Sequence, residues 1–182
     1  NNGTYIEPNK SPLYDWLVFW LNEYMVNKIK HSTRASYDFY INKHIKNKIG
    51  QITLGKLRGD MIQKFYNDLL KNGRLDGKGG LNPKTIKNLH NMLHEALEQA
   101  VKNDMIPKNP CKIITLPKSS KKEMRVLSVE EQEKIIKAAK NERLGIGVIL
   151  ALFTGVRLGE LVGLKWKDID FDTKTIHIKR TL

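Results

Sequence analysis

Residues 154–170 read TGVRLGELVGLKWKDID, and this stretch decides how the chain is interpreted. Arg157 follows a glycine break after an apolar, helical stretch at about 144–153, and Glu160 shares its face of the next predicted helix. We expect such an arginine to be largely stripped of water and therefore to need an anionic partner. The planar guanidinium suits a phosphate. The residues alone therefore leave two interpretations open, a structural ion pair with Glu160 or a phosphate site.

The sequence around this stretch predicts a mixed α/β region. Residues 168–181 alternate between apolar and polar side chains on either side of a turn at 172–174, which predicts a β-hairpin. Gly155, Gly159 and Gly163 recur every four residues, and we interpret them as sites of close helix packing rather than as a phosphate loop.

Farther upstream, the spacing of apolar residues predicts only helices. Caps are expected at Ser11-Pro12, at Ser32, at Asn82-Pro83 and at Ser128, where Glu131 completes a capping box. Trp16 and Trp20 are interpreted as core residues. Residues 73–81 contain four glycines and are expected to form a mobile loop. The expected helices begin near Ser11, cover about 33–45 and about 60–71, run from Asn82 to before Pro107, and resume at Ser128. The inner stripe of the helix that Asn82 caps is predicted to be Ile86, Leu89, Leu93, Leu97 and Ala100.

These patterns divide the chain into four parts. We predict a flexible lead-in at 1–10, a helical domain at 11–116, a basic linker at 117–127 and the start of an α/β domain at 128–182. The linker has four basic residues, one acidic residue and no apolar stripe, so a role in charge recognition is expected.

The composition indicates a polyanionic partner. The net charge is +13, from 32 basic and 19 acidic residues, so nucleic acid is the first candidate and an anionic membrane surface the second. Part of the excess can reflect a Lys-rich composition. Cys111 is the single cysteine, which excludes a disulfide framework and fits a reducing cytoplasm. His90 and His94 stand four apart without a third ligand at motif spacing, so no metal site is expected.

The stretch at 154–170 resembles the first catalytic box of the tyrosine recombinase (phage integrase) family, T-G-x-R-x-x-E-x-x-x-L-x-W-x-D-I. The matching residues are Thr154, Gly155, Arg157, Glu160, Leu164, Trp166, Asp168 and Ile169. The helical region resembles the family's core-binding domain, including the start at Thr85-Ile86 and the exit at Asn109-Pro110, and residues 127–131 resemble the opening of its catalytic domain. The resemblance covers nearly the whole chain from about residue 11 and is closest to integrases of conjugative transposons and temperate phages.

The resemblance implies a mainly α fold, with an all-helical, SAM-like core-binding domain before the N-terminal part of a mixed α/β catalytic domain. It implies site-specific recombination of double-stranded DNA through a 3′-phosphotyrosine, with no metal and no cofactor. Arg157 would bind the scissile phosphate and stabilise the transition state, and Glu160 would orient it. Active members of the family work as tetramers on paired DNA sites.

The chain also departs from the family pattern. The family's catalytic lysine lies on the hairpin that starts here; Lys174, Lys179 and Arg180 are near, but we expect that lysine beyond Leu182. His177 and Arg180 fit the spacing of the family's H-x-x-R box, but they fall on a predicted strand, on opposite faces, so we reject them. All six tyrosines precede Arg157, whereas the family's nucleophile follows it. We therefore expect a fragment that binds DNA but does not cleave it.

Three groups of residues are expected to contact DNA. They are Lys118, Lys121, Lys122 and Arg125 in the linker, Lys84, Thr85, Lys87 and Asn88 at a helix front, and Ser32, Thr33 and Arg34 at a helix start. For any single lysine, an ordinary solvated face is an equally good interpretation. Two other functions stay open: a non-catalytic DNA-binding regulator or architectural protein, and a basic helical module that binds acidic protein or membrane.

Overall fold

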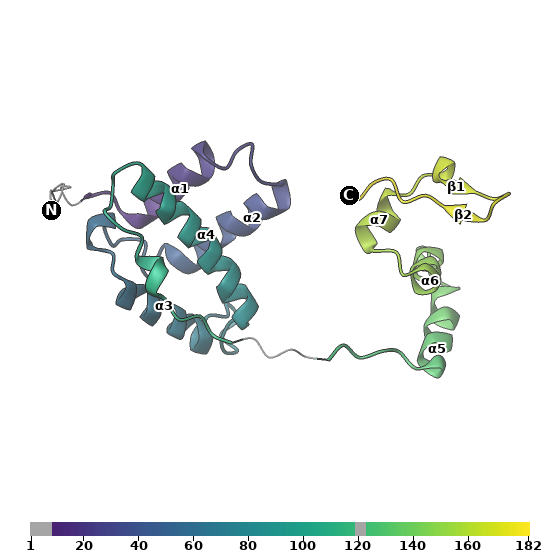
Figure 1. The fold of residues 1–182 in the computed structure, drawn as a ribbon. Helices are drawn as coiled ribbons and strands as arrows, with labels where there is room; N and C mark the ends of the chain where they lie inside the picture. Colours follow the sequence, from purple (N-terminus) through teal and green to yellow (C-terminus); the bar gives the residue numbers. More distant parts are fainter. Residues whose placement is uncertain (1–8, 119–122) are drawn as a thin grey trace. The chain divides into compact units, whose positions relative to one another are not determined.

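The structure is a computed structural model that describes residues 9–118 and 123–182 (Figure 1). The chain divides into two compact units, Asn1–Lys121 (unit 1) and Lys122–Leu182 (unit 2). Among the described residues, no helix is both long enough and apolar enough to cross a membrane.

Unit 1 is built from helices that pack around one long central helix (Figure 1). Its elements are α1 (Leu13–Glu23), α2 (His31–Phe39), a π-helical continuation η1 (Tyr40–Ile45), η2 (Leu54–Lys56), α3 (Gly59–Asn72), α4 (Pro83–Lys102) and η3 (Pro110–Ile113). The helix expected at about 33–45 is therefore confirmed as the run of α2 and η1, and its last six residues are wound more widely than an α-helix.

The apolar stripe of α4 forms the centre of the unit 1 core. Its fully buried residues are Ile86, Leu89, Met92, Leu93, Ala96, Leu97 and Ala100, which confirms the predicted stripe and adds Met92 and Ala96. Trp16 and Trp20 of α1 are buried as expected, and the indole N–H of Trp16 donates to the carbonyl of Ala96 at 3.0 Å. Burial of these large side chains supplies most of the free energy that holds the helices together.

The cap of α4 is confirmed, whereas those of α1 and α2 were predicted wrongly. The side-chain oxygen of Asn82 accepts the N–H of Lys84 at 2.9 Å. At α1, Pro12 occupies the N-cap position, and the N–H of Leu13 donates to the carbonyl of Ile52 at 2.9 Å instead of to Ser11. The carbonyl of Ile52 therefore satisfies a helix-start N–H group that the sequence had assigned to the side chain of Ser11.

The second wrong cap lies at the start of α2. This helix begins at His31 after Lys30, so Ser32 lies inside its first turn and makes no cap. The carbonyl of Ser32 accepts the hydroxyl of Ser36 at 3.0 Å, which is the local bond that a serine inside a helix offers.

The segment after α4 is fixed to unit 1 by two side-chain amides. Asn109 is 3% exposed; its amide donates to the carbonyl of His94 at 3.0 Å and to Glu98 at 2.8 Å, and its oxygen accepts the N–H of Cys111 at 2.9 Å. Gln63 of α3 makes two bonds to the backbone of Thr115, at 3.1 and 2.9 Å. The point at which the chain leaves unit 1 is therefore determined by tertiary hydrogen bonds.

The described part of unit 2 contains three α-helices, a short 3-10 helix and a short hairpin. Its elements are α5 (Val129–Ala139), α6 (Gly145–Thr154), α7 (Leu158–Gly163), η4 (Trp166–Asp168), β1 (Ile169–Asp170) and β2 (Thr175–Ile176). The predicted capping box of α5 is confirmed, because Ser128 accepts the N–H of Glu131 at 3.3 Å and its own N–H donates to that carboxylate at 3.0 Å. The predicted hairpin is also confirmed, with Ile169 opposite Ile176.

Large apolar side chains of unit 2 lie at its surface. Within its helices and η4, strongly exposed examples are Trp166 at 82%, Ile146 at 77%, Leu158 at 75% and Phe153 at 74%. The described part of unit 2 therefore buries far less apolar surface than unit 1 does. Its few buried polar contacts consequently make a larger relative contribution to its stability.

Candidate functional site

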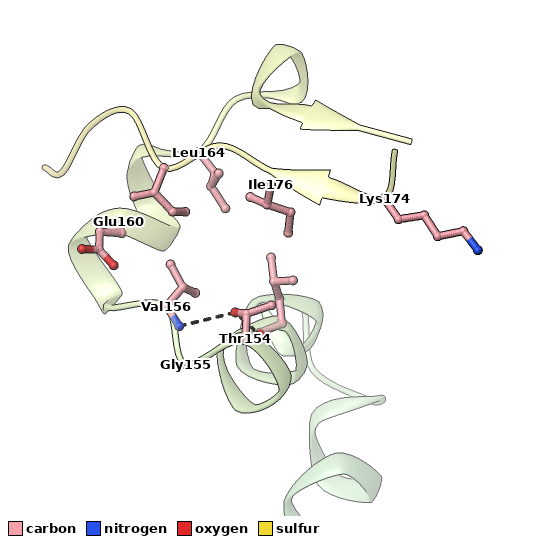
Figure 2. Close-up of a pocket in the computed structure, with 9 residues that line it drawn as sticks. Thr154, Gly155, Val156, Glu160, Leu164, Lys174 and Ile176 are labelled. Carbon is pink, nitrogen blue, oxygen red and sulfur yellow. Dashed lines mark hydrogen bonds between the residues drawn. The ribbon is translucent and has the colours of Figure 1, made fainter. Parts of the chain in front are cut away.

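The site is built around the turn that joins α6 to α7. Gly155 ends α6 in the left-handed region, at a φ of 68°, where a side chain is strained, and this lets the chain reverse direction. The hydroxyl of Thr154 donates to the carbonyl of Leu150 at 2.7 Å and accepts the N–H of Val156 at 3.4 Å. Figure 2 shows Thr154 turned toward Val156 at this corner. The turn places Arg157 at the N-cap of α7.

Glu160 holds both the backbone and the side chain of Arg157. One carboxylate oxygen accepts the N–H of Arg157 at 2.9 Å, and the other accepts the guanidinium Nη1 at 2.9 Å. The hydrogen bond from the N–H of Arg157 lowers the pKa of Glu160 below its usual range, and the bond from the guanidinium adds to this shift. A carboxylate at this place also complements the positive end of the helix. Glu160 therefore stays ionised and fixes the direction in which Arg157 leaves the helix.

The expectation that Arg157 is stripped of water was wrong. Its side chain is 86% exposed, whereas that of Glu160 is 21% exposed. The reason is that α7 is six residues long and lies at the surface of the described part of unit 2. Within the described chain, Nη1 is the guanidinium nitrogen with a protein partner. The remaining donors of the planar fork face solvent and can receive a second anion.

A hollow of about 420 Å³ lies beside this turn. It is lined by Leu150, Thr154, Gly155, Val156, Glu160, Leu164, Lys174, Ile176 and Ile178. Aliphatic side chains line much of it, together with the carboxylate of Glu160, and Arg157 does not line it, so the hollow is poorly suited to an anion. Figure 2 shows the side chain of Lys174 extending outward from the hairpin, away from the other lining residues.

Residues 177–180 follow β2 and are neither helical nor part of the strand. The prediction that they fall on a strand was therefore wrong, since β2 ends at Ile176. Arg180 is bound to Asp168 and to the carbonyl of Gly163, and the N–H of His177 donates to the carbonyl of Asp168 at 2.8 Å. These contacts are tertiary and do not form the helical pair that an H-x-x-R box requires.

Unit 1 carries a polar groove between α2 and α4, with a volume of about 350 Å³. It is lined by Ser32, Thr33, Ser36, Tyr37, Tyr40, Asn88 and Asn91. The groove brings together three of the residues expected to contact DNA, Ser32, Thr33 and Asn88. Ser36, Tyr37 and Tyr40 were missed, although Ser32, Ser36 and Tyr40 stand four apart, the spacing of one helix face. Burial raises the pKa of Tyr37, which keeps its hydroxyl a neutral donor.

The basic residues near this groove differ in whether their charged groups are free to meet a ligand or are already bound within unit 1. Lys84 and Lys87 are exposed on the first two turns of α4, and Thr85 is half-buried beside them. The guanidinium of Arg34 is instead engaged within unit 1, where it donates to the carbonyl of Leu21 at 2.9 Å and to the side chain of Asn22 at 2.6 Å. Neither lysine forms an ion pair with any residue that the structure describes, whereas Arg34 mainly ties α2 to the end of α1.

The segment expected as a basic linker is described only in part. Lys118 is exposed, and Arg125 forms an ion pair with Glu131 of the α5 capping box. Lys121 and Lys122 lie outside the described residues.

The two histidines of α4 face different neighbours. His90 lies 3.3 Å from the hydroxyl of Tyr66, and burial lowers its pKa, with His94 adding to the shift. His94 lies 4.0 Å from Glu98. Across residues 9–118 and 123–182, no group of three or more metal-ligating side chains is found.

Sequence comparisons connect both units with one protein family. Residues 13–70 match the family described as "Phage integrase, N-terminal SAM-like domain", and residues 125–181 match the "Phage integrase family". A "Tyrosine recombinase XerC-like" protein of Caldanaerobacter subterraneus subsp. tengcongensis is 34% identical over 100% of this chain and 46% of its own length. The "ICEBs1 integrase" of Bacillus subtilis is 28% identical over 72% of this chain and 34% of its own. The chain thus spans less than half the length of these relatives.

Solved structures agree with this fold. A lambda integrase dimer bound to a COC′ core site matches 89% of this chain and 44% of its own, at 27% identity and a TM-score of 0.71. The Tn1549 transposon integrase in complex with circular intermediate DNA matches 93% of this chain and 54% of its own, at 20% identity and a TM-score of 0.72. The order of helical unit and mixed unit is therefore shared with these structures.

Proposed function

The chain belongs to the phage integrase family, and from this premise we propose that it serves site-specific DNA recombination as the DNA-binding part of a tyrosine recombinase. In this proposal, residues 11–116 are the core-binding domain, 117–127 the linker and 128–182 the first portion of the catalytic domain. The phosphotyrosine intermediate would form in the longer protein, on a tyrosine outside this chain. Neither metal nor cofactor is required, because the phosphotyrosine conserves the energy of the cleaved bond.

The observation that carries this proposal is the state of Arg157. Its guanidinium is fixed at one nitrogen by Glu160 and is otherwise open to solvent, at 86% exposure. A phosphate placed there receives two parallel N–H donors from a group that never loses its charge. Arg157 would thus bind the scissile phosphate and stabilise the charge that develops in the transition state, with Glu160 orienting it. A fully satisfied, buried ion pair would have favoured the purely structural interpretation.

Double-stranded DNA is the proposed partner, held partly by unit 1. The groove between α2 and α4 offers hydroxyls and amides, and Lys84 and Lys87 add positive charge at the start of α4. Thr85 and Asn88 belong to the same helix front. Ser32 and Thr33 would contribute from α2, and Arg34 would support that helix. The linker residues Lys118, Lys121, Lys122 and Arg125 would run along the phosphate backbone.

An assembly of four chains on paired DNA sites is proposed for the longer protein. Lambda integrase is described as a tetramer bound to a Holliday junction, and it is 26% identical over 88% of this chain and 45% of its own length. Cleavage and exchange of four strands need four active sites, so this chain would form part of one of the four subunits in the reacting complex.

The role of Arg157 is tested in the complete recombinase that contains these residues. Arg157→Ala should lower the rate of covalent protein–DNA adduct formation by at least ~100-fold, because a preorganised anion-stabilising group is removed. Duplex affinity should change by less than about threefold, since most phosphate contacts lie elsewhere. Arg143→Ala removes the same charge from an exposed site of unit 2 and serves as the control. Normal adduct formation by Arg157→Ala would refute the assignment.

The DNA face of unit 1 is tested with the chain itself. Replacing Lys84 and Lys87 by alanine should reduce the slope of log K against log salt by about 2 for B-DNA, because two phosphate contacts are lost. Replacing Lys102 and Lys108 by alanine removes the same charge at and beyond the opposite end of α4 and should leave the slope unchanged. Equal slopes for the two double variants would place DNA elsewhere. Equal binding of heparin and duplex would favour a general polyanion-binding module.

A further inference from the structure

Asp168 is a buried carboxylate in a unit whose large apolar side chains are mostly exposed. Its side chain is 1% exposed. One oxygen accepts the N–H of Lys165 at 3.0 Å and also pairs with Nη1 of Arg180, while the other accepts Nη2 of Arg180 at 3.2 Å. The pair is bidentate, the geometry in which an arginine fixes a carboxylate most firmly. A buried charge with this many partners indicates a specific structural task.

The same guanidinium reaches the end of α7. Nη1 of Arg180 also lies 3.2 Å from the carbonyl of Gly163, the last residue of that helix. A cation at this position satisfies an otherwise unpaired helix carbonyl and complements the negative end of the helix. Arg180 therefore joins η4 to the C-terminal end of α7.

Two glycines let the chain after β2 lie directly against α7. A Cβ atom on Gly159 would stand 2.5 Å from the hydroxyl of Thr181 and 2.8 Å from the carbonyl of Leu182. A Cβ on Gly163 would meet Arg180 itself, at 3.1 Å from Cγ and 3.2 Å from the carbonyl oxygen. The N–H of Leu182 donates to the carbonyl of Gly159 at 3.0 Å. Residues 180–182 are thus a strap that covers one face of α7.

The strap matters because α7 cannot fix its own orientation. A helix of six residues is far too short to be stable alone, so its direction depends on tertiary contacts. Glu160 fixes the first turn internally, but it moves together with Arg157. The contacts of Asp168 and Arg180 come from outside the helix.

We propose that Arg180, held by Asp168, is a positioning residue that orients α7 and through it the guanidinium of Arg157 toward the scissile phosphate. This proposal rests on the proposed function. In this proposal, Asp168 and Arg180 together hold α7 in its orientation. Arg180 would touch no substrate and would act only through the helix.

The first test measures amide hydrogen exchange in the 182-residue chain without DNA. Arg180→Ala should raise exchange of the Leu161 and Leu182 amides at least ~10-fold, because a charge-assisted hydrogen-bond pair is lost. Arg180→Lys keeps the charge but cannot bridge both partners, so a smaller increase is expected. Lys179→Ala removes an exposed neighbouring charge that acts on Asp168 through space alone, so a much smaller increase than in Arg180→Ala is expected. Unaltered exchange at Gln132, in the first turn of α5, shows that each variant folds.

The second test measures adduct formation by the complete recombinase with the same substitutions. Misplacement of Arg157 by about 1 Å should slow adduct formation by up to ~100-fold in Arg180→Ala, with partial recovery in Arg180→Lys and duplex affinity unchanged. Unchanged exchange in α7 for both Arg180 variants would overturn the strap. Faster exchange with normal adduct formation would leave the strap purely structural and overturn its positioning role. Failure of the proposed function is separate, since it appears as normal cleavage by Arg157→Ala.

Discussion

Replacement of Asn109 by alanine should lower the free energy of unfolding of unit 1 by about 3 kcal/mol. The side chain is 3% exposed and makes three hydrogen bonds, to the carbonyl of His94, to Glu98 and from the N–H of Cys111. Alanine would leave the N–H of Cys111 without its partner in a place that water reaches poorly, and the carbonyl of His94 would keep only its bond within α4. The segment at 109–116 would then lose the hydrogen bonds of Asn109 to α4 and keep the ion pair of Lys112 with Glu98.

The magnitude follows from the partners. Each neutral bond contributes about 1 kcal/mol net, and the bond to the Glu98 carboxylate contributes about 2 kcal/mol because one partner is charged. The sum is about 4 kcal/mol, from which about 1 kcal/mol is subtracted because the ordered side chain regains rotamer freedom and the lysine-paired Glu98 can be rehydrated. The expected loss is large against the 5–15 kcal/mol that is typical of a whole domain.

Urea unfolding followed by tryptophan fluorescence measures this loss. Trp16 and Trp20 are buried in unit 1, at 3% and 0% exposure, whereas Trp166 of unit 2 is 82% exposed. The fluorescence change therefore reports unit 1. The midpoint should fall by about 2 M at an unchanged slope of about 1.5 kcal/mol per M.

Asn103 provides a matched control. It is exposed, donates to the hydroxyl of Tyr24 at 2.8 Å and accepts from Gln99 at 3.0 Å. Because water can replace both partners, Asn103→Ala should cost less than about 0.5 kcal/mol. If Asn109→Ala is no more destabilising than Asn103→Ala, then the three bonds do not hold the exit segment and the reasoning is wrong.

Three further results are expected. Ser128→Ala should destabilise the first turn of α5 by about 1 kcal/mol through loss of its cap, seen as faster exchange of the Glu131 amide, whereas Ser36→Ala should have little effect. Burial raises the pKa of Cys111 to about 12, so at pH 8 the thiol should react with a disulfide reagent only as fast as unit 1 opens; immediate reaction would contradict its burial. Arg180 lowers the pKa of Asp168, so the pair's stabilising contribution is present above the unfolded value of about 3.9 and is lost as the pH falls through the lower folded value. NMR titration of that carboxyl should therefore give a midpoint below the unfolded one, and a midpoint above it would contradict the ion pair.

What the sequence predicted well was set by neighbours along the chain. The stripe of α4 follows from helical periodicity, and the caps at Asn82 and Ser128 need only the next two or three residues. The hairpin follows from alternation around a turn in which Asp170 accepts the N–H groups of Asp172 and Thr173, both at 3.0 Å. Each of these features depends mainly on residues that are close together along the chain, so it can be predicted without knowing the tertiary fold.

What the sequence did not predict depends on residues that are distant along the chain. The carbonyl of Ile52 replaces Ser11 at the start of α1, some forty positions away, and no local pattern announces it. The exposure of Arg157 was predicted wrongly for the same reason, because burial depends on what the rest of the unit places over a side chain. The polar groove likewise needs α2 and α4 to be adjacent in space.

The arginine side chains differ in exposure, and this difference separates the structural contacts of Arg34 and Arg180 from the role proposed for Arg157. Arg34 and Arg180 each donate to a backbone carbonyl and to a side chain on another element, so their forks are committed inside the protein. Arg157 follows a strained turn, has one guanidinium nitrogen engaged, and is 86% exposed beside an ionised carboxylate that fixes its direction. An anion that arrives at Arg157 can take up open donors without breaking a tertiary contact, whereas at Arg180 it would have to displace Asp168. Phosphate binding is therefore expected at Arg157, which the protein holds by one guanidinium nitrogen. Arg180, held by both Nη atoms, is expected to make the local structure rigid.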